Sequence, residues 1–526
     1  MAALAPTIIQ RRIVVAAGFC VVAFTMIGAR LVDLTLLKGA ETGVTAGVDI
    51  APVMRADIVD RNGQLLARDL PVFDLYARPH VFWDKQSAAQ GLSRATGANL
   101  HRLEHAFAGN HNYVLVASQI APETRDNVMH LGLPGLEFEP SSKRFYPQGD
   151  AAQVLGVTQT FAGGKGITGL EKGLNAQLAA GTPAQLSLDM RIQYVLMNAA
   201  AEAREKYNAK AAGGIVLNVN TGEVLAMASI QDPSQPDYNP NRNIMTANAY
   251  ELGSVFKVLT FAMALEDRTI NFDSTFKVGS GFPIGRFVIH DAEHMPDYMK
   301  AKDILAQSSN AGTAQIALLS GGERQKAFLN HMGLLSILHT ELPEDVRPHY
   351  PSNWGQVETA TIGFGHGITV SPLAYVAAAA AVVNGGRRIH PTFLKHPEDA
   401  RGIQLLRPET SLQMRQLLRY VVTDGTGKLA DIQGYDVGGK TGSAEKNVDR
   451  RYVAHKLLTS FCAVFPIDNP RYLVFVLLDE PHGPNATGVM ALAGHTAAPL
   501  AGEVIARIAP MLEMPPVAMA ASGENP

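Results

Sequence analysis

An uncharged segment near the N-terminus constrains the fold of this chain most strongly. Ile13–Ala29 form a run of seventeen residues without a charge, directly after Arg11 and Arg12. Such a run is at the short end of what spans a bilayer as a helix, and the apolar residues that follow can extend it. The arginines before the run favour a cytoplasmic N-terminus and an exported body. We therefore expect a cytoplasmic stub at 1–12 and a single transmembrane anchor at 13–37.

A cleaved signal peptide is the alternative, because it also places charge before an apolar run. The best cleavage candidate, Ile27-Gly28-Ala29, is a poor one, and bulky Phe19 before Cys20 does not fit a lipoprotein signal. The residues favour an uncleaved anchor. A mature N-terminus near Arg30 would instead identify a signal peptide.

The remainder is long enough for two or three folded units. The 526 residues carry a formal net charge of -3 with both signs interspersed, which gives no basic face for nucleic acid. Residues 38–185 read as short β-like runs separated by turns, with an Asn62-Gly63 hairpin signal and a short helix at the end. This half has no nucleophile–base pattern, so we predict a β-rich domain with a mechanical role.

The pattern changes near Gln185, and residues 186–510 predict a second domain. A strand and an amphipathic helix are followed by a hairpin at 220–222, mostly helical sequence to about Val383, and strands again near the end. Strands at both ends of the domain imply an antiparallel sheet flanked by helices. We expect an α+β fold, a closing helix at 501–512 and a disordered tail at 511–526.

The spacing Ser-x-x-Lys is of interest because a serine nucleophile needs a base within reach. It occurs three times, at Ser254–Lys257, Ser274–Lys277 and Ser443–Lys446. Ser254 stands at the start of the run "SVFKVLTFAMALEDR", which is apolar nearly all round and reads as a buried helix. A lysine one turn along such a helix lies on the same face and loses its charge unless it finds a partner, so it can accept the serine proton. On this stretch alone, a helix-capping serine with a snorkelling lysine stays open.

The other two pairs fit a nucleophile and its base less well. Both occur in stretches that read as strands, where residues three apart point to opposite faces. We therefore expect neither pair to meet.

Two further motifs strengthen the interpretation of Ser254. Ser308-Ser309-Asn310 lies between two helical runs, and Lys440-Thr441-Gly442 lies on an apparent strand. Each alone is weak, since the first is usually a helix cap and the second a turn. Together, in the order Ser-x-x-Lys, Ser-x-Asn, Lys-Thr-Gly, they are typical of serine acyl transferases that recognise penicillin.

On these motifs the chain resembles a class B penicillin-binding protein of the division (septal) type. The segments "ADIVDRNGQLLA", "GITGLEKGLN", "NTGEVLAMAS" and "IGFGHGITVSPL" are also similar to family segments in family order. The family usually has glycine where Ala56 stands, proline where Leu252 stands and threonine where Ser443 stands. None of these departures removes a catalytic group, but Leu252 puts in doubt how the loop of the nucleophile is held.

The resemblance implies a role for each motif residue. Ser254 is the nucleophile, Lys257 its base, Ser308 the proton relay to the leaving amine, and Asn310 a ligand of the substrate amide that also steadies Lys257. The substrate carboxylate is expected at Lys440, Thr441, Gly442 and Ser443. The N–H groups of Ser254 and Ser443 are expected to form the oxyanion hole. No cofactor and no metal are implied.

The resemblance also implies partners and a location. The substrate is a stem pentapeptide of peptidoglycan ending in D-Ala-D-Ala, and β-lactams acylate the same serine. A SEDS-type glycan polymerase and other divisome membrane proteins are expected to bind the anchor and residues 38–185, the pedestal or dimerisation-like domain of the family. The protein is expected in the bacterial inner membrane as a single-pass protein with a periplasmic body.

Other functions stay open from the sequence. They are an elongation-type transpeptidase, a D,D-carboxypeptidase or β-lactamase that passes the acyl group to water, and an inactive sensor or scaffold. The segment His290 to His294, "HDAEH", fits an inverted zinc-protease pattern, but that chemistry needs both histidines on one helix face. Glycine and proline around it favour an extended chain, so we expect no zinc site there.

Overall fold

The computed structural model describes most of the chain. It covers residues 54–160, 164–396, 402–448, 451–483, 491–514 and 516, and near the N-terminus residues 18, 21, 22 and 24–26. Among these residues no helix is both long and apolar enough to cross a membrane. The anchor predicted at 13–37 lies outside the described residues except for those six positions.

A mixed sheet occupies the first half. Its central strand is β2, paired with β3 and β4 on its two sides and with β1 near its start, and β5 joins β1 in parallel. The strands are β1 (Ile58–Val59), β2 (Leu65–Ala77), β3 (Val114–Ile120), β4 (Leu136–Phe145) and β5 (Ala184–Gln185). The predicted hairpin at Asn62-Gly63 is confirmed, because Gly63 has a φ of 85° and β1 pairs with β2 antiparallel.

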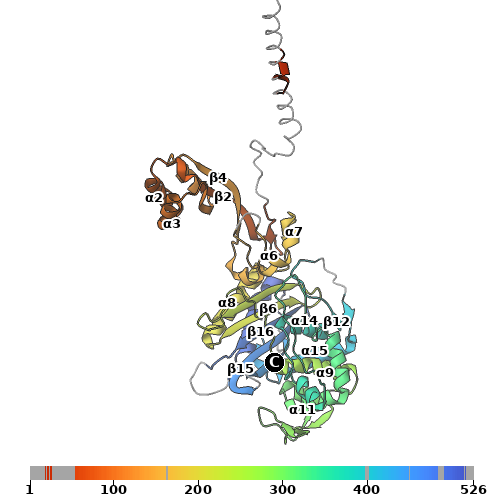
Figure 1. The fold of residues 1–526 in the computed structure, drawn as a ribbon. Helices are drawn as coiled ribbons and strands as arrows, with labels where there is room; N and C mark the ends of the chain where they lie inside the picture. Colours follow the sequence, from red (N-terminus) through yellow and green to blue (C-terminus); the bar gives the residue numbers. More distant parts are fainter. Residues whose placement is uncertain are drawn as a thin grey trace, which may run out of the picture. The chain divides into compact units, whose positions relative to one another are not determined.

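Three helices pack on this sheet, and the sequence reading did not foresee them. They are α2 (Lys85–Thr96), α3 (Leu100–Ala108) and α4 (Pro122–Met129), which share a core with β2 and β3. Short helices α6 (Gly169–Gly173) and α7 (Asn175–Ala179) follow, where a short helix was predicted. Figure 1 shows α2 and α3 beside β2 and β4.

A buried cluster of charges ties distant parts of the first half together. Glu171 accepts from the Nε atoms of both Arg55 and Arg144, each at 2.7 Å. Arg144 also lies 3.3 Å from Asp69, and Asp69 accepts the Arg55 backbone N–H at 2.8 Å. All four side chains are at most 4% exposed, so each charge is compensated within the cluster.

The second sheet is antiparallel throughout, in the order β14-β15-β16-β6-β7. Its strands are β6 (Ala211–Asn218), β7 (Val224–Gln231), β14 (Gly438–Val448), β15 (Arg451–Phe465) and β16 (Tyr472–Asp479). The predicted pairing of strands from both ends of the domain is confirmed by the ladder between β6 and β16. In the described part of the chain β14 pairs only with β15, so it is an edge strand.

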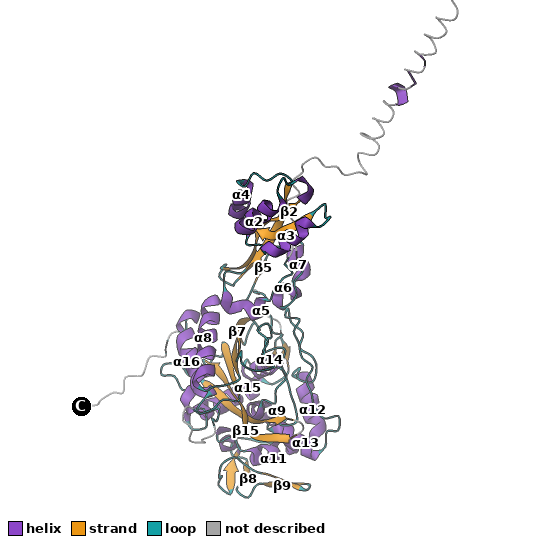
Figure 2. Ribbon diagram, turned by 60° about the vertical axis from the view of Figure 1, so that its left-hand side comes forward, coloured by secondary structure: helices purple, strands orange, loops and turns teal. Residues whose placement is uncertain are grey.

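Helices cover both faces of this sheet, as predicted. One face packs on α8 (Met190–Lys206) and α16 (Ala497–Ile508), and Figure 2 shows these two helices together. The other face packs on α9 (Lys257–Glu266), α14 (Pro372–Val383) and α15 (Pro408–Thr423). Every residue of α14 is buried, and the helix ends at Val383, where the predicted helical stretch ends.

The helix predicted from Ser254 begins later than expected. A 3-10 turn, η4 (Gly253–Phe256), precedes α9. Beyond α9 lie β8 (Thr275–Lys277), β9 (Phe282–Ile284), β10 (Phe287–Ile289), β11 (Tyr298–Lys300), α10 (Ala301–Ala306), α11 (Asn310–Ser320), α12 (Gly322–His331) and α13 (Gln356–Gly363).

The last helix and the predicted tail also differ in part from expectation. Helix α16 begins and ends about four residues before the predicted 501–512. Within the predicted tail, Met511, Leu512 and Met514 pack against the core on the α16 face. Residues 515 and 517–526 lie outside the described part of the chain.

Candidate active site

The turn that carries Ser254 is pressed against strand β14. Gly253 has a φ of 59°, and a Cβ atom there would lie 2.9 Å from the carbonyl oxygen of Ser443. Only glycine fits this backbone and this clearance. Leu252, where the family usually has proline, is buried at 1% exposure. Ser254 itself is half-buried and lines a cavity of about 210 Å³.

Lys257 lies one turn further on, at the start of α9, and is fully buried. Its Nζ donates to the carbonyl oxygen of Ser308 and, at 3.2 Å, to the Ser308 hydroxyl. Burial, and then the nearby charge of Lys440, hold the pKa of Lys257 well below its usual range, while Asp291 opposes that shift. A lysine in this state is available as a neutral base.

Ser308 joins the two lysines of the site. It lies between α10 and α11, as predicted, in the left-handed region with a φ of 62°. Its hydroxyl oxygen accepts from Lys440 Nζ at 3.0 Å as well as from Lys257. One hydroxyl thus lies within hydrogen-bond distance of both amines, which suits a proton relay.

Lys440 projects inward from β14 and is also fully buried. Besides Ser308, its Nζ donates to the Thr441 carbonyl at 3.0 Å and to the Thr441 hydroxyl at 3.1 Å. Burial lowers the pKa of Lys440 to about 7. No described carboxylate forms an ion pair with Lys257 or Lys440.

Thr441 and Ser443, which follow Lys440 on β14, line the cavity of Ser254. The Thr441 hydroxyl is 2.6 Å from that of Thr426, and the Ser443 hydroxyl accepts the Ala493 N–H at 3.1 Å. Gly442 faces the core, where a Cβ atom would lie 2.6 Å from the Ser460 hydroxyl. The cavity is lined by Ser254, Ala292, Glu293, Met295, Gln307, Ser308, Asn310, Thr426, Thr441, Ser443, Leu492, Gly494 and His495.

Five of the eight predicted site residues therefore line one cavity. Lys257 and Lys440 reach it through their bonds to Ser308, and Gly442 faces the core. Asn310 lines the cavity, but within the described residues no hydrogen bond joins its side chain to Lys257. The partners of Lys257 come from Ser308 instead.

The competing Ser-x-x-Lys pairs are arranged differently. Ser274 hydrogen-bonds with Asn271 in a turn before β8. Lys446 donates to Asp479 at 2.7 Å and to Glu480 at 3.0 Å, on a strand that was predicted correctly. Neither lysine has its serine as a hydrogen-bond partner among the described residues.

Asp291 is a site residue that sequence reasoning missed. Its carboxylate accepts from the Ser309 hydroxyl at 2.8 Å, from the Ala311 N–H at 3.1 Å, and from the Asn310 N–H. It therefore holds the start of α11, where anions are favoured. The segment His290 to His294, which contains it, is not helical. Within the described residues no group of three His, Cys, Asp or Glu side chains could hold a metal ion.

A second missed group lies beside the Ser254 turn. The His366 ring stacks on Tyr452 with centroids 5.3 Å apart, and the Tyr452 hydroxyl donates to Glu251 at 3.2 Å. Burial, and then the Lys257 charge, lower the pKa of His366 to about 4. His366 is therefore neutral near pH 7. Periodicity could not reveal this group, because its members come from three separate segments.

Two protein-family models match the chain. Residues 212–506 match "Penicillin binding protein transpeptidase domain", and residues 50–184 match "Penicillin-binding Protein dimerisation domain".

Similar proteins span almost the whole chain. A probable peptidoglycan D,D-transpeptidase FtsI of Caulobacter vibrioides is 38% identical over 523 residues, which is 94% of this chain and 87% of that protein. A probable peptidoglycan D,D-transpeptidase PenA of Neisseria meningitidis is 30% identical and covers 82% of this chain and 81% of its own. Among solved structures, penicillin-binding protein 3 of Mycobacterium tuberculosis complexed with aztreonam is 25% identical. It superposes with a TM-score of 0.69 over 89% of this chain and 98% of its own.

Proposed function

Because this chain belongs to the class B penicillin-binding proteins, we propose that it cross-links peptidoglycan as a serine D,D-transpeptidase through an acyl-enzyme at Ser254. One observation carries the assignment of roles. Two buried lysines, Lys257 and Lys440, reach the same Ser308 hydroxyl at 3.2 and 3.0 Å, beside a cavity that Ser254 lines. This arrangement provides a nucleophile, a base and a proton path.

The first half-reaction forms an ester. The Ser254 oxygen attacks the carbonyl carbon between the two terminal D-alanines, and neutral Lys257 takes the serine proton. The backbone N–H groups of Ser254 and Ser443 stabilise the negative oxygen that forms. The C–N bond then breaks, the leaving amine receives a proton through Ser308, and D-alanine departs.

The substrate is held by charge at one end and by backbone along its length. Lys440, Thr441 and Ser443 receive the terminal carboxylate, and Asn310 bonds the substrate amide. The outer edge of β14 has unpaired backbone groups in the described part of the chain. An extended peptide can add to such an edge as a further strand.

The second half-reaction transfers the acyl group. An amine from a neighbouring stem peptide attacks the ester carbon, an amide bond forms, and Ser254 recovers its proton through Lys257. β-Lactams acylate Ser254 by the same first step, but the opened ring stays attached and blocks the acceptor. No cofactor takes part.

The cellular role is septal cell-wall synthesis, by similarity to the FtsI protein of Caulobacter vibrioides. We assign residues 1–12 to a cytoplasmic stub, 13–37 to an inner-membrane anchor, 38–185 to the pedestal and 186–510 to the transpeptidase domain. The anchor and pedestal would contact a SEDS-type glycan polymerase and other divisome proteins. Rescue of division by a protein that starts near Lys38 behind a cleavable signal would overturn this assignment.

The function is tested by covalent labelling with a fluorescent penicillin and mapping of the labelled peptide. Label is expected on Ser254, and Ser254→Ala should remove it. Ser274→Ala and Ser443→Ala are matched controls that should keep the acylation site. Label on Ser274 would refute the assignment, and rapid loss of label to water would favour a hydrolase.

A further inference from the structure

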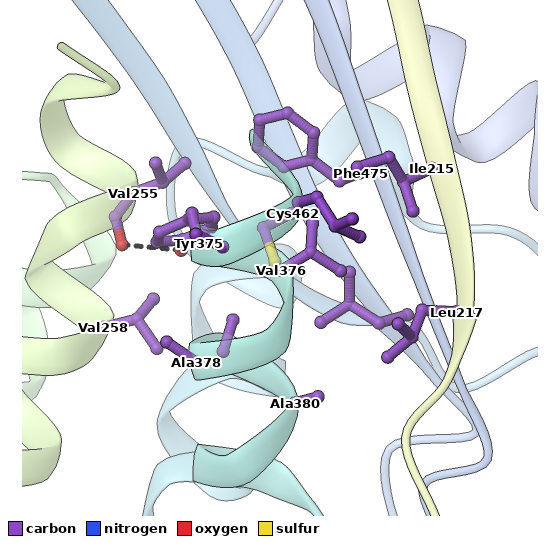
Figure 3. Packing of buried hydrophobic residues seen from close by; sticks show 14 of the residues in the cluster. Ile215, Leu217, Val255, Val258, Tyr375, Val376, Ala378, Ala380, Cys462 and Phe475 are labelled. Carbon is purple, nitrogen blue, oxygen red and sulfur yellow. Dashed lines mark hydrogen bonds between the residues drawn. The ribbon is translucent and has the colours of Figure 1, made fainter. Parts of the chain in front are cut away.

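A buried tyrosine lies beneath the turn that carries Ser254. Tyr375 is on α14 and is fully buried. Its hydroxyl donates to the backbone carbonyl of Val255 at 2.9 Å, the bond drawn as a dashed line in Figure 3. Val255 directly follows Ser254 in the 3-10 turn η4. The bond therefore holds the peptide next to the nucleophile.

Two aromatic rings fix the position of this tyrosine. Its ring stacks with Phe256, with centroids 5.9 Å apart, and lies 5.8 Å from Phe475 of β16. These two contacts in a fully buried site restrict the ring, and its hydroxyl donates to one carbonyl. A buried hydroxyl that lost this partner would pay a desolvation cost, so the bond persists in the folded state.

The same side chain also packs against the sheet. Cys462 of β15 lies beside Tyr375 in the core (Figure 3), and burial raises the pKa of the Cys462 thiol to about 12, so that the thiol stays protonated. Cys462 lies directly opposite Lys440 in the ladder between β14 and β15. Tyr375 is thus bonded to the turn of Ser254 and packs beside the strand position that is paired with Lys440.

We propose that Tyr375 is a positioning residue for acylation, whose hydroxyl fixes the orientation of the Ser254 turn relative to strand β14. The proposal rests on the function proposed above. The Ser254 hydroxyl and its N–H group must both point into the cavity, and a shift of the turn η4 at Val255 would move them. Small misplacements are costly, because about 1 Å can reduce a rate roughly 100-fold.

The test is Tyr375→Phe in the full-length protein, which keeps the ring and removes the hydroxyl. Time courses of acylation over a range of fluorescent penicillin concentrations separate the dissociation constant of the non-covalent complex from the acylation rate constant. We expect the rate constant to fall about tenfold, as for loss of one hydrogen bond that matters in the transition state. The dissociation constant should stay within about twofold, and the pH profile of the rate constant should not move, because Tyr375 does not contact Lys257.

Two control variants separate positioning from stability. Ser187 is buried and donates to the Val224 carbonyl at 2.7 Å, so Ser187→Ala removes a similar bond away from the site. It should lower the melting temperature without changing the acylation rate constant. Cys462→Ala keeps the bond to Val255 and should change the rate constant by less than about threefold.

Clear results would overturn the proposal. One is an unchanged rate constant in Tyr375→Phe, and another is an equal loss in Ser187→Ala. Amide hydrogen exchange gives a second measurement, since exchange within Gly253–Phe256 should accelerate in Tyr375→Phe and not in Ser187→Ala. Failure of the unmodified protein to be acylated at Ser254 would instead refute the proposed function.

Discussion

Two buried charge clusters in this protein are built in opposite ways. In the first half, Arg55 and Arg144 meet Glu171 and Asp69, and every charge has an opposite partner. In the second, Lys257 and Lys440 are both fully buried beside one serine hydroxyl, with no ion pair to a described carboxylate.

The difference separates structure from chemistry. A compensated cluster keeps its charges and fixes the chain segments that supply them. Burial lowers the pKa of both amines, and the charge of Lys440 lowers that of Lys257 further, so a neutral amine can accept a proton at moderate pH. The Arg–Glu–Asp cluster stabilises the fold of the first half. The two buried lysines provide a reactive base and lower the stability of the second.

The sharpest test of this contrast is Lys257→Met. Acylation by penicillin should fall by about 100-fold or more, the usual scale for loss of a general base. The melting temperature should rise. The folded-state pKa of Lys257 lies below its ordinary value of 10.5, so the unfolded chain binds this proton more readily and the lysine destabilises the fold at neutral pH.

That stability gain should shrink as the pH rises toward 10.5, where the unfolded chain also loses the proton. Thermal unfolding of both proteins at pH 7 and above pH 10 measures it. Unchanged acylation in Lys257→Met would show that Lys257 is not the base. A lower melting temperature at pH 7 would show that Lys257 does not destabilise the fold.

Breaking the compensated cluster should have the reverse effect. Glu171→Gln leaves two buried arginines without their shared carboxylate, and we expect a loss of about 3–5 kcal/mol in the free energy of unfolding. Protein that remains folded should be acylated at the normal rate, because the Glu171 carboxylate bonds to Arg55 and Arg144, which both lie in the first half. Chemical denaturation and penicillin labelling measure the two quantities. Lost acylation in folded protein would show that the clusters are coupled.

The pH dependence should separate the two lysines. The acylation rate constant should fall as the pH drops through the lowered pKa of Lys257, because the base becomes protonated. The affinity of the free enzyme for the penicillin carboxylate should weaken as the pH rises through about 7, where Lys440 loses its charge. The acylation rate constant and the dissociation constant of the non-covalent complex, measured separately from pH 5 to 9, distinguish the two effects. Lys440→Gln should remove the pH dependence of the dissociation constant.

The smallest effect is expected from Asp291→Asn. Asp291 acts against the lowered pKa of Lys257, so removing its charge should move the acid limb of acylation to still lower pH. The amide can still accept hydrogen bonds at the start of α11, so the loss of rate should be modest, about tenfold or less. Glu293→Gln, which changes a neighbouring carboxylate on the cavity, is the matched control. A shift of the acid limb of acylation toward higher pH would contradict the inferred effect of Asp291 on the pKa of Lys257.

Features of the fold that depend on neighbouring residues could be predicted from local patterns in the sequence. A serine and a lysine three apart at the start of an apolar helix share a face by helix geometry alone. The segment that contains Lys440-Thr441-Gly442 was correctly predicted as a strand. The sequence also predicted that strands from both ends of the domain form one antiparallel sheet, and the pairing of β6 with β16 joins them. The N-terminal helices were not predicted, and the packed face of α2 offers only one large apolar residue, Leu92, beside Ala88 and Ala89.

Contacts across long sequence separations could not be read in the same way. The Lys440 bond to Ser308 spans 132 residues, and no periodicity encodes that distance. The same holds for Asp291 at the start of α11 and for Tyr375 beneath Val255. These side chains have ordinary local surroundings and acquire their roles only when the sheet and helices pack.

The narrow clearance between Gly253 and the Ser443 carbonyl has a consequence for antibiotic resistance. In the proposed binding mode, a ligand that adds along β14 bonds to backbone peptide groups, which substitutions other than proline leave in place. We therefore expect substitutions that affect β-lactam acylation to include positions such as Leu252 and Ala444, which pack where the strand approaches the turn of the serine. Substitutions there would slow the antibiotic and the natural substrate together, which limits how far such an enzyme can escape.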